Sequence, residues 1–290
     1  MKSNFELFLK KLFQEKNIRP LKSFGQNFVI SEKILEKVIE SANLCPKDIV
    51  LEIGAGPGNL TKKIARRVKK VIAVEKDKRM IAILEETLKN FKNVKIIEGD
   101  ALEFEPKSHR LRADNYKLIG NLPYYITSAI IKKFLETENR PSQMVLMIQK
   151  EIAQRICSQP PKMNLLALSV QFYAKPRIIA YISKNCFWPK PKVDSAIIKL
   201  NIKGKNLKNN KDIFFKIIKA GFAHPRKQLA NNLSSELKLD KERIKSWLLK
   251  NKINPSQRAE TLKEKDWLNL TQNFAKNFQK YYNKTINTKT

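Results

Sequence analysis

The chain has 290 residues, of which 58 are Lys or Arg and 27 are Asp or Glu, so its formal charge is +31. This excess favours a polyanionic partner, because each phosphate that a protein neutralises releases counterions, although a genome-wide preference for Lys would explain part of it. Three widely spaced cysteines and only two histidines argue against a disulfide framework and a histidine-based metal site.

The first 20 residues are charged throughout, and no run approaches the roughly 18 apolar residues that a membrane span needs. We therefore expect a cytoplasmic protein with neither a membrane nor a metal as a partner.

The first 150 residues alternate short apolar runs with amphipathic stretches. The apolar runs predict strands at residues 49–53, 71–75, 94–97, 116–119 and 144–148. Apolar residues spaced three and four apart predict helices at residues 59–68, 77–88 and 126–135. This alternation is typical of an α/β fold, in which helices cover both faces of a largely parallel sheet.

The rest of the chain changes character twice. After predicted helices at 149–157 and 164–173, residues 177–183 and 193–202 predict two successive strands, which would form an antiparallel pair at the sheet edge. A polar, turn-rich stretch at 203–206 then precedes predicted helices at 213–222, 226–237, 241–249 and 267–280. We predict a first domain of residues 1–204, a helical domain of residues 205–281 and a polar tail of residues 282–290.

The helical part of the chain is a candidate surface for RNA. Residues 203–290 contain 21 basic and 7 acidic side chains, so positive charge is denser there than in the preceding residues.

A glycine-rich loop follows the first predicted strand of the sheet. Gly54, Gly56 and Gly58 lie where open parallel sheets bind ligands, and glycine lets the backbone approach a ligand closely. Glu75 ends the second strand, where its carboxylate could accept both hydroxyls of a ribose. Asp100 follows the third strand and could accept a hydrogen bond from an adenine amine. Each feature alone could be a tight turn or a helix cap, but together they indicate a nucleoside site.

The tetrapeptide Asn121-Leu122-Pro123-Tyr124 follows the fourth strand and should face the same crevice. The amide oxygen of Asn121 can accept a hydrogen bond from an exocyclic amine. Pro123 stiffens the segment, so the carbonyl of Leu122 can serve as a second acceptor. Tyr124 offers an aromatic face for a flipped-out base. The alternative interpretation is a β-turn followed by a core tyrosine.

A second aromatic candidate precedes the last predicted strand. Phe187 could cover the other face of a base, while Lys190 and Lys192, in a stiff proline-containing loop, meet phosphates. A phenylalanine ahead of prolines is also common in ordinary loop packing.

Five motifs in order carry a resemblance to a known family. The chain has GQNF at 25–28, LEIGAGPG at 51–58, GDA at 99–101, NLPY at 121–124 and FWPKPKVDS at 187–195. From about residue 21 to about residue 270, it resembles the ribosomal RNA adenine dimethyltransferases. The resemblance implies a class I, Rossmann-like methyltransferase fold that uses S-adenosylmethionine, followed by a small helical domain.

The resemblance also implies roles for individual residues. Tyr124 and Phe187 would sandwich the target adenine, and Arg226 and Lys227 would contact RNA. At Val29 the family usually has Leu. The implied cofactor site comprises Asn27, Val29, Gly54, Gly56, Glu75, Lys76, Asp100, Ala101 and Asn121.

Within this family, one branch dimethylates two adjacent adenines in a hairpin near the 3′ end of small-subunit rRNA. The other modifies one adenine of large-subunit rRNA and confers macrolide resistance. Leu122, Asp194 and the run HPRKQL at 224–229 resemble the first branch, so we expect the partner to be rRNA in the small subunit or its precursor. We also expect a monomer. A third possibility is a non-catalytic RNA-binding or transcription factor that keeps this fold.

Overall fold

The computed structural model of the chain describes residues 4–204 and 210–286. It divides into two compact units, one of Met1–Gln154 with Ala174–Ile202 and one of Arg155–Tyr173 with Lys203–Thr290. The sequence-based division at residue 204 placed residues 155–173 in the first domain, whereas the structure groups them with the C-terminal helices. The physical reason is aromatic packing, because Phe172 stacks on Phe214 with 4.4 Å between ring centroids.

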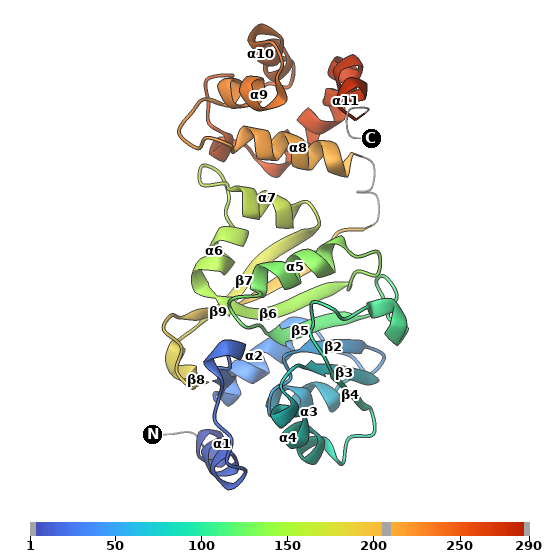
Figure 1. Cartoon of the computed structure of the whole chain (residues 1–290), viewed down its shortest axis with the longest axis vertical. Helices are drawn as coiled ribbons and strands as arrows, with labels where there is room; N and C mark the ends of the chain where they lie inside the picture. Colours follow the sequence, from blue (N-terminus) through green and yellow to red (C-terminus); the bar gives the residue numbers. More distant parts are fainter. Residues whose placement is uncertain (1–3, 205–209, 287–290) are drawn as a thin grey trace. The chain divides into compact units, whose positions relative to one another are not determined.

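A seven-stranded sheet forms the first unit, and its first five strands are parallel (Figure 1). The sixth strand in spatial order is antiparallel to both neighbours, which confirms the predicted antiparallel pair. The spatial order is β4 (Val94–Glu98), β3 (Lys70–Glu75), β2 (Ile49–Ile53), β5 (Lys117–Asn121), β6 (Gln143–Gln149), β9 (Ser195–Ile202) and β7 (Ala174–Ile182).

Helices cover both faces of this sheet because the chain moves along it in opposite directions from β2. Right-handed crossovers place α3 (Asn59–Ala65) and α4 (Lys78–Leu88) on one face, and α5 (Thr127–Glu136) on the other. Leu60 of α3 and Leu84 of α4 share a buried apolar cluster with Leu35 of α2 (Glu32–Ala42). The α/β fold class predicted from the sequence is therefore confirmed.

The reversal of direction creates a crevice at the carboxyl ends of β2 and β5, the place where such sheets bind ligands. Gly54 directly follows β2, and Asn121 is the last residue of β5. The two meet closely, since a Cβ added at Gly54 would lie 3.2 Å from the main-chain oxygen of Asn121.

An N-terminal layer that the sequence did not predict packs beside the sheet. It comprises α1 (Asn4–Glu15), the 3-10 helix η1 (Lys22–Phe24) and β1 (Phe28–Val29), which pairs antiparallel with β8 (Phe187–Trp188). The ring of Phe13 packs edge-on against one ring from each strand of this ribbon. Its centroid lies 5.6 Å from that of Phe28 and 5.3 Å from that of Trp188. The cluster around Phe13 thus joins α1 to both strands.

The second unit is helical, as predicted. Gly221 is required where it stands, because an added Cβ would lie 2.3 Å from the ring of the buried Trp267. The predicted polar tail, 282–290, falls partly in α11, and residues 287–290 lie outside the described residues, as do 205–209. The helices are α6 (Lys150–Ile156), which begins in the first unit, α7 (Leu165–Gln171), α8 (Lys211–Gly221), α9 (Leu229–Leu237), α10 (Lys241–Lys250) and α11 (Glu264–Ile286).

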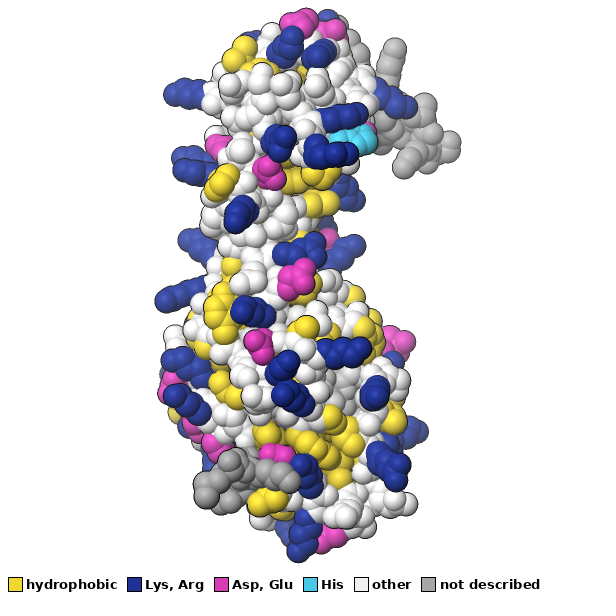
Figure 2. Space-filling view, turned by 90° about the vertical axis from the view of Figure 1, so that its left-hand side faces the viewer, with side chains coloured by type: hydrophobic (Ala, Val, Ile, Leu, Met, Phe, Trp, Pro, Cys, Tyr) yellow, Lys and Arg dark blue, Asp and Glu magenta, His cyan; other side chains and the backbone are white. Residues whose placement is uncertain are grey.

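Lys and Arg side chains are spread over the surface in Figure 2, with few Asp and Glu between them. Within the described ranges, no helix is both long and apolar enough to cross a membrane.

Candidate active site

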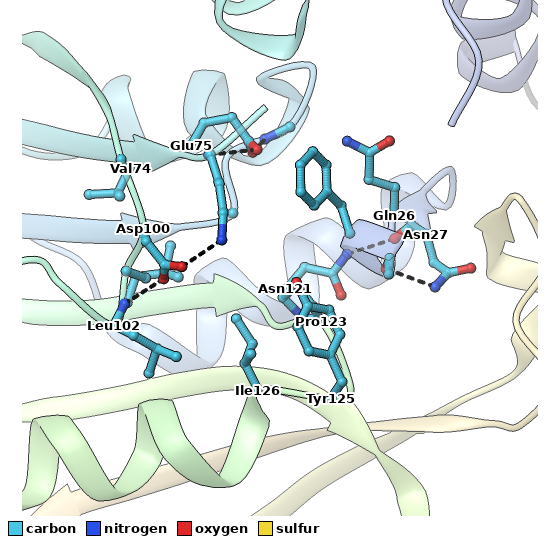
Figure 3. Close-up of a pocket in the computed structure, with 18 of the residues that line it drawn as sticks. Gln26, Asn27, Val74, Glu75, Asp100, Leu102, Asn121, Pro123, Tyr125 and Ile126 are labelled. Carbon is cyan, nitrogen blue, oxygen red and sulfur yellow. Dashed lines mark hydrogen bonds and ion pairs between the residues drawn. The ribbon is translucent and has the colours of Figure 1, made fainter. Parts of the chain in front are cut away.

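The crevice at the carboxyl ends of the parallel strands brings together most of the residues that the sequence assigned to a cofactor (Figure 3). Val29 is the exception, because it is buried at 3% exposure behind the crevice. Residues that the sequence missed also line it, among them Gln26, Phe28, Leu102, Tyr125 and Ile126. The predicted residues that line it are Asn27, Gly54, Gly56, Glu75, Lys76, Asp100, Ala101, Asn121 and Pro123.

Glu75 is fixed against the glycine loop by backbone hydrogen bonds. The Gly56 N–H donates to its Oε2 at 2.8 Å, and the N–H groups of Lys76 and Asp77 donate to Oε1 at 2.9 and 3.0 Å. Burial raises the pKa of Glu75, and these three N–H groups oppose the shift. The carboxylate is therefore held in one orientation at the crevice wall, where its remaining lone pairs can accept hydroxyl groups.

Asp100 is oriented by two donors on either side of its carboxylate. Lys76 Nζ lies 2.7 Å from Oδ2, and the Leu102 N–H donates to Oδ1 at 2.8 Å. The hydrogen bond from Lys76 lowers the pKa of Asp100, so this group is an anion at neutral pH. An amine that binds Asp100 would share its oxygens with Lys76, whose side chain is half exposed.

Asn121 has its amide orientation set by a segment far away in the sequence. Its Nδ2 donates to the main-chain oxygen of Asn27 at 2.7 Å, and the Nδ2 of Asn27 donates to the Gly25 carbonyl at 3.0 Å. No described residue donates to the Oδ1 of Asn121. Because the nitrogen is engaged, the oxygen is the atom that can accept a hydrogen bond from a ligand.

Of the rest of the tetrapeptide, Pro123 lines the crevice, whereas Leu122 and Tyr124 do not. Leu122 is buried, and its N–H donates to the Met147 carbonyl at 3.1 Å. Tyr124 is half-buried, with its hydroxyl 2.8 Å from Ser195 Oγ, and burial raises its pKa. The next residue, Tyr125, lines the crevice and is 61% exposed. The base-stacking role assigned to Tyr124 stays a prediction.

The other residues predicted to contact the base or RNA lie elsewhere. Phe187 is 3% exposed and pairs with Val29 across the β1–β8 ribbon, in the apolar cluster of the sheet. Lys190 is exposed in the loop that follows, and so is Lys192. The structure places Arg226 and Lys227, both exposed, between α8 and α9 of the second unit.

Glu52, one residue before the end of β2, is buried on the side of the sheet that α3 covers. It is 1% exposed, and burial raises its pKa to about 8. Glu52 does not line the crevice. We therefore expect it to affect the stability of the packing beneath the glycine loop and not to contact a ligand.

The glycine loop leaves room for a ligand to approach the backbone, because its glycines carry no side chains and their geometry disfavours any other residue. Gly54 and Gly56 have positive φ angles of 73° and 55°, and a Cβ at Gly56 would lie 3.1 Å from the Phe28 ring. The two acceptors, a fixed carboxylate at Glu75 and an ionised one at Asp100, match the donating hydroxyls and amine of an adenosine. This arrangement, on a parallel sheet with one antiparallel strand inserted, defines a class I methyltransferase.

Within the described part of the chain, no group of three or more His, Cys, Asp or Glu could hold a metal ion.

Comparison with known proteins identifies the family. The family model for ribosomal RNA adenine dimethylase matches residues 17–276, so the chain belongs to this family. It is accordingly an S-adenosylmethionine-dependent rRNA adenine methyltransferase, as the sequence motifs indicated.

Similar proteins of known name agree with this assignment. The chain is 39% identical over 270 residues to ribosomal RNA small subunit methyltransferase A of Dehalococcoides mccartyi strain CBDB1, covering 92% of this chain and 93% of that protein. It is also 39% identical to the protein of the same name from Alkaliphilus oremlandii, covering 92% and 96%.

Two solved structures share the fold over most of the chain. A dimethyladenosine transferase from Plasmodium falciparum has a TM-score of 0.74 at 29% identity, covering 86% of this chain and 98% of that one. The 23S rRNA methyltransferase ErmE has a TM-score of 0.72 at 25% identity, covering 85% and 98%.

Proposed function

We propose that the protein transfers methyl groups from S-adenosylmethionine to the N6 amines of two adjacent adenines in a hairpin near the 3′ end of small-subunit rRNA. It would act as a monomer, in the cytoplasm, on the small subunit or its precursor. The observation that carries the proposal is the Asn121 amide, whose nitrogen is held by the Asn27 carbonyl while its oxygen is left to accept an amine. The name of the curated relatives supports the choice of subunit.

The residues of the tetrapeptide would orient the amine rather than activate it. Asn121 Oδ1 and the Leu122 carbonyl accept its two hydrogens, and Pro123 keeps the two acceptors in place. The nitrogen lone pair then points away from both acceptors, toward the cofactor side of the crevice. S-adenosylmethionine, when bound, supplies the electrophilic methyl group. Transfer of that group, with N–C bond formation and S–C bond cleavage together, would depend on the proximity and alignment that these residues provide.

No general base is needed, because the nitrogen would be acidic once alkylated and would lose its proton to solvent water. The two histidines agree with this view. His109 is stacked on Phe104, with 4.7 Å between ring centroids, and it does not line the crevice. His224 belongs to the second unit.

The second candidate function is methylation of large-subunit rRNA, which the fold shared with ErmE keeps open. The higher identity to the small-subunit relatives weighs against it. A non-catalytic binding function is disfavoured because Glu75 and Asn121 are both present and oriented.

The deciding experiment offers purified protein and S-adenosylmethionine two substrates from an unmethylated source, small subunits and large-subunit rRNA. Mass spectrometry of the digested RNA locates dimethyladenine. We expect two adjacent dimethyladenines in small-subunit rRNA. Modification of large-subunit RNA alone would identify the protein as a large-subunit methyltransferase of the resistance branch. Modification of neither RNA would support a non-catalytic RNA-binding function.

A further inference from the structure

A second crevice lies on the same edge of the first unit, beyond the cofactor site. It is lined by Gln149, Lys150, Glu151, Gln154, Lys184, Lys192, Val193 and Asp194. Gln149 is the last residue of the parallel strand β6 and pairs with Ser195, the first residue of the antiparallel strand β9. The crevice is therefore at the carboxyl edge of the parallel strands, where methyl transfer is proposed to occur.

Asp194 builds the wall of this crevice and ties its lysines to the reactive tetrapeptide. Its main-chain oxygen accepts the Lys150 N–H at 3.0 Å, and its Oδ1 accepts the Lys184 N–H at 3.0 Å. The next residue, Ser195, hydrogen-bonds the hydroxyl of Tyr124 at 2.8 Å. The backbone positions of two lysines are thus fixed relative to the residue after Pro123.

The charge of the crevice is positive and its rim carries an aromatic ring. Lys150, Lys184 and Lys192 line the crevice together with the acids Glu151 and Asp194, of which Asp194 accepts a hydrogen bond from a backbone N–H. Tyr181, near the end of β7, is 54% exposed, and Lys150 Nζ lies 5.1 Å from its ring centroid. An exposed ring beside lysines is the combination with which proteins bind single-stranded nucleic acid.

We propose that this crevice binds a nucleotide of the RNA strand next to the target adenine, with its phosphate on Lys150, Lys184 and Lys192 and its base stacked on Tyr181. The inference rests on the proposed function, since it specifies how that site receives its substrate. Tyr124 and Ser195 form the link between the two crevices. A strand that leaves its flipped adenine in the first crevice meets the second one at the same edge of the sheet. Lys and Arg side chains are spread over the face of the molecule on which α6 and β8 lie (Figures 1 and 2).

The test uses the full-length protein and a hairpin RNA from the 3′ end of small-subunit rRNA. Four proteins are compared with wild type: a triple variant, K150A/K184A/K192A, and the single variants Y181L, Y181F and K47A. Lys47 is exposed just before β2, at the opposite edge of the sheet, so K47A removes one charge away from the crevice. Fluorescence anisotropy gives the RNA Kd at several salt concentrations, methyl transfer gives KM and kcat, and calorimetry gives the S-adenosylmethionine Kd.

We expect the triple variant to raise the RNA Kd and KM more than tenfold and to flatten the salt dependence of log K by about 0.7–0.9, since the three lysines neutralise one phosphate and each phosphate contributes that much to the slope. Y181L should raise the Kd about tenfold, whereas Y181F, which keeps the stacking face, should stay within about twofold. S-adenosylmethionine affinity should be unchanged in every variant, which excludes misfolding.

Two results would overturn the inference. The crevice would have no part in RNA binding if the triple variant and Y181L matched K47A in Kd and salt slope. If only the lysine substitutions mattered, the nucleotide site would reduce to a charged surface and the assignment to Tyr181 would be wrong. Failure of the wild-type protein to methylate small-subunit RNA would instead refute the proposed function, and the RNA Kd values would still decide the crevice.

Discussion

Replacing Asn121 by alanine separates the orientation of the amine from the binding of the cofactor. The substitution removes the Oδ1 acceptor and also the 2.7 Å hydrogen bond from Nδ2 to the Asn27 carbonyl. Loss of that hydrogen bond should lower the free energy of unfolding by about 0.5–1.5 kcal/mol. Loss of one aligned hydrogen-bonding group that acts in the transition state should lower kcat by about 10²–10³, equivalent to about 2.7–4 kcal/mol.

The assay is single-turnover methyl transfer to saturating small subunits, with the S-adenosylmethionine Kd measured by calorimetry on the same preparations. Asn93→Ala is a matched control, because the Asn93 Nδ2 also donates to main-chain oxygens, those of Ala65 and Val68, at 2.8 and 3.0 Å. Asn93 precedes β4 and is therefore remote from the carboxyl ends of the strands. It should lose comparable stability and keep the wild-type rate.

We expect Asn121→Ala to change the cofactor Kd by less than about tenfold while the rate falls at least about 100-fold. A rate within tenfold of wild type would refute the assignment of Asn121 as an acceptor for the amine. An equal fall in rate for the Asn93 variant would attribute the effect to lost stability.

Three further predictions concern the surroundings of the crevice. Glu75→Ala should weaken S-adenosylmethionine binding by about 10- to 100-fold in calorimetry, since hydrogen bonds to a charged group contribute about 1.5–3 kcal/mol, and an unchanged Kd would refute the ribose assignment. Glu52, with its pKa raised from 4.5 to about 8, keeps a proton in the folded state that the unfolded chain loses between those values. Wild-type stability should therefore fall between pH 4.5 and 8 relative to Glu52→Gln, by at most about 5 kcal/mol at 1.36 kcal/mol per pH unit; parallel urea-unfolding profiles for the two proteins would contradict this. Phe13→Ala should lower the free energy of unfolding by up to about 3–5 kcal/mol and weaken cofactor binding, because Phe13 packs on Phe28, whose ring faces Gly56. An unchanged cofactor Kd would confine α1, which precedes the residues matched by the family model, to a structural function.

The sheet and the strand-end residues could be predicted because parallel strands make a simple pattern. Buried on both faces, such strands appear as short apolar runs, and their carboxyl ends all meet at one edge. Gly54, Glu75, Asp100 and Asn121 each follow or end a run of this kind, so their convergence needed no knowledge of long-range contacts. The crevice that contains all four was predictable for this reason.

The rest of the site depends on contacts that no local pattern encodes. The β1–β8 ribbon has two residues in each strand, too few for an alternating pattern, and it joins Val29 to Phe187. The stripe of α1 that packs on Phe28 is interrupted by lysines in the sequence, so the sequence analysis predicts no helix in the first 20 residues. Adjacent tyrosines point to different surroundings, and their order in the chain gives no sign that Tyr125 rather than Tyr124 lines the crevice.

In the proposed reaction, the hydrogen bond between Asn121 and Asn27 would connect the residue that orients the amine to a segment that lines the cofactor crevice. The side-chain amide of asparagine carries an oxygen that accepts hydrogen bonds and an NH2 group that donates them, so without other contacts either group could face a substrate. The Asn27 carbonyl, in the loop that also lines the crevice, engages the nitrogen, so the oxygen is the atom that the proposed function assigns to the amine. Under the proposed function, a change that moves this loop should therefore loosen the orientation of the Asn121 amide toward the adenine. Because the chemistry relies on alignment instead of a titrating base, the precision of this one contact limits how well the cofactor and the target nitrogen can be placed in line.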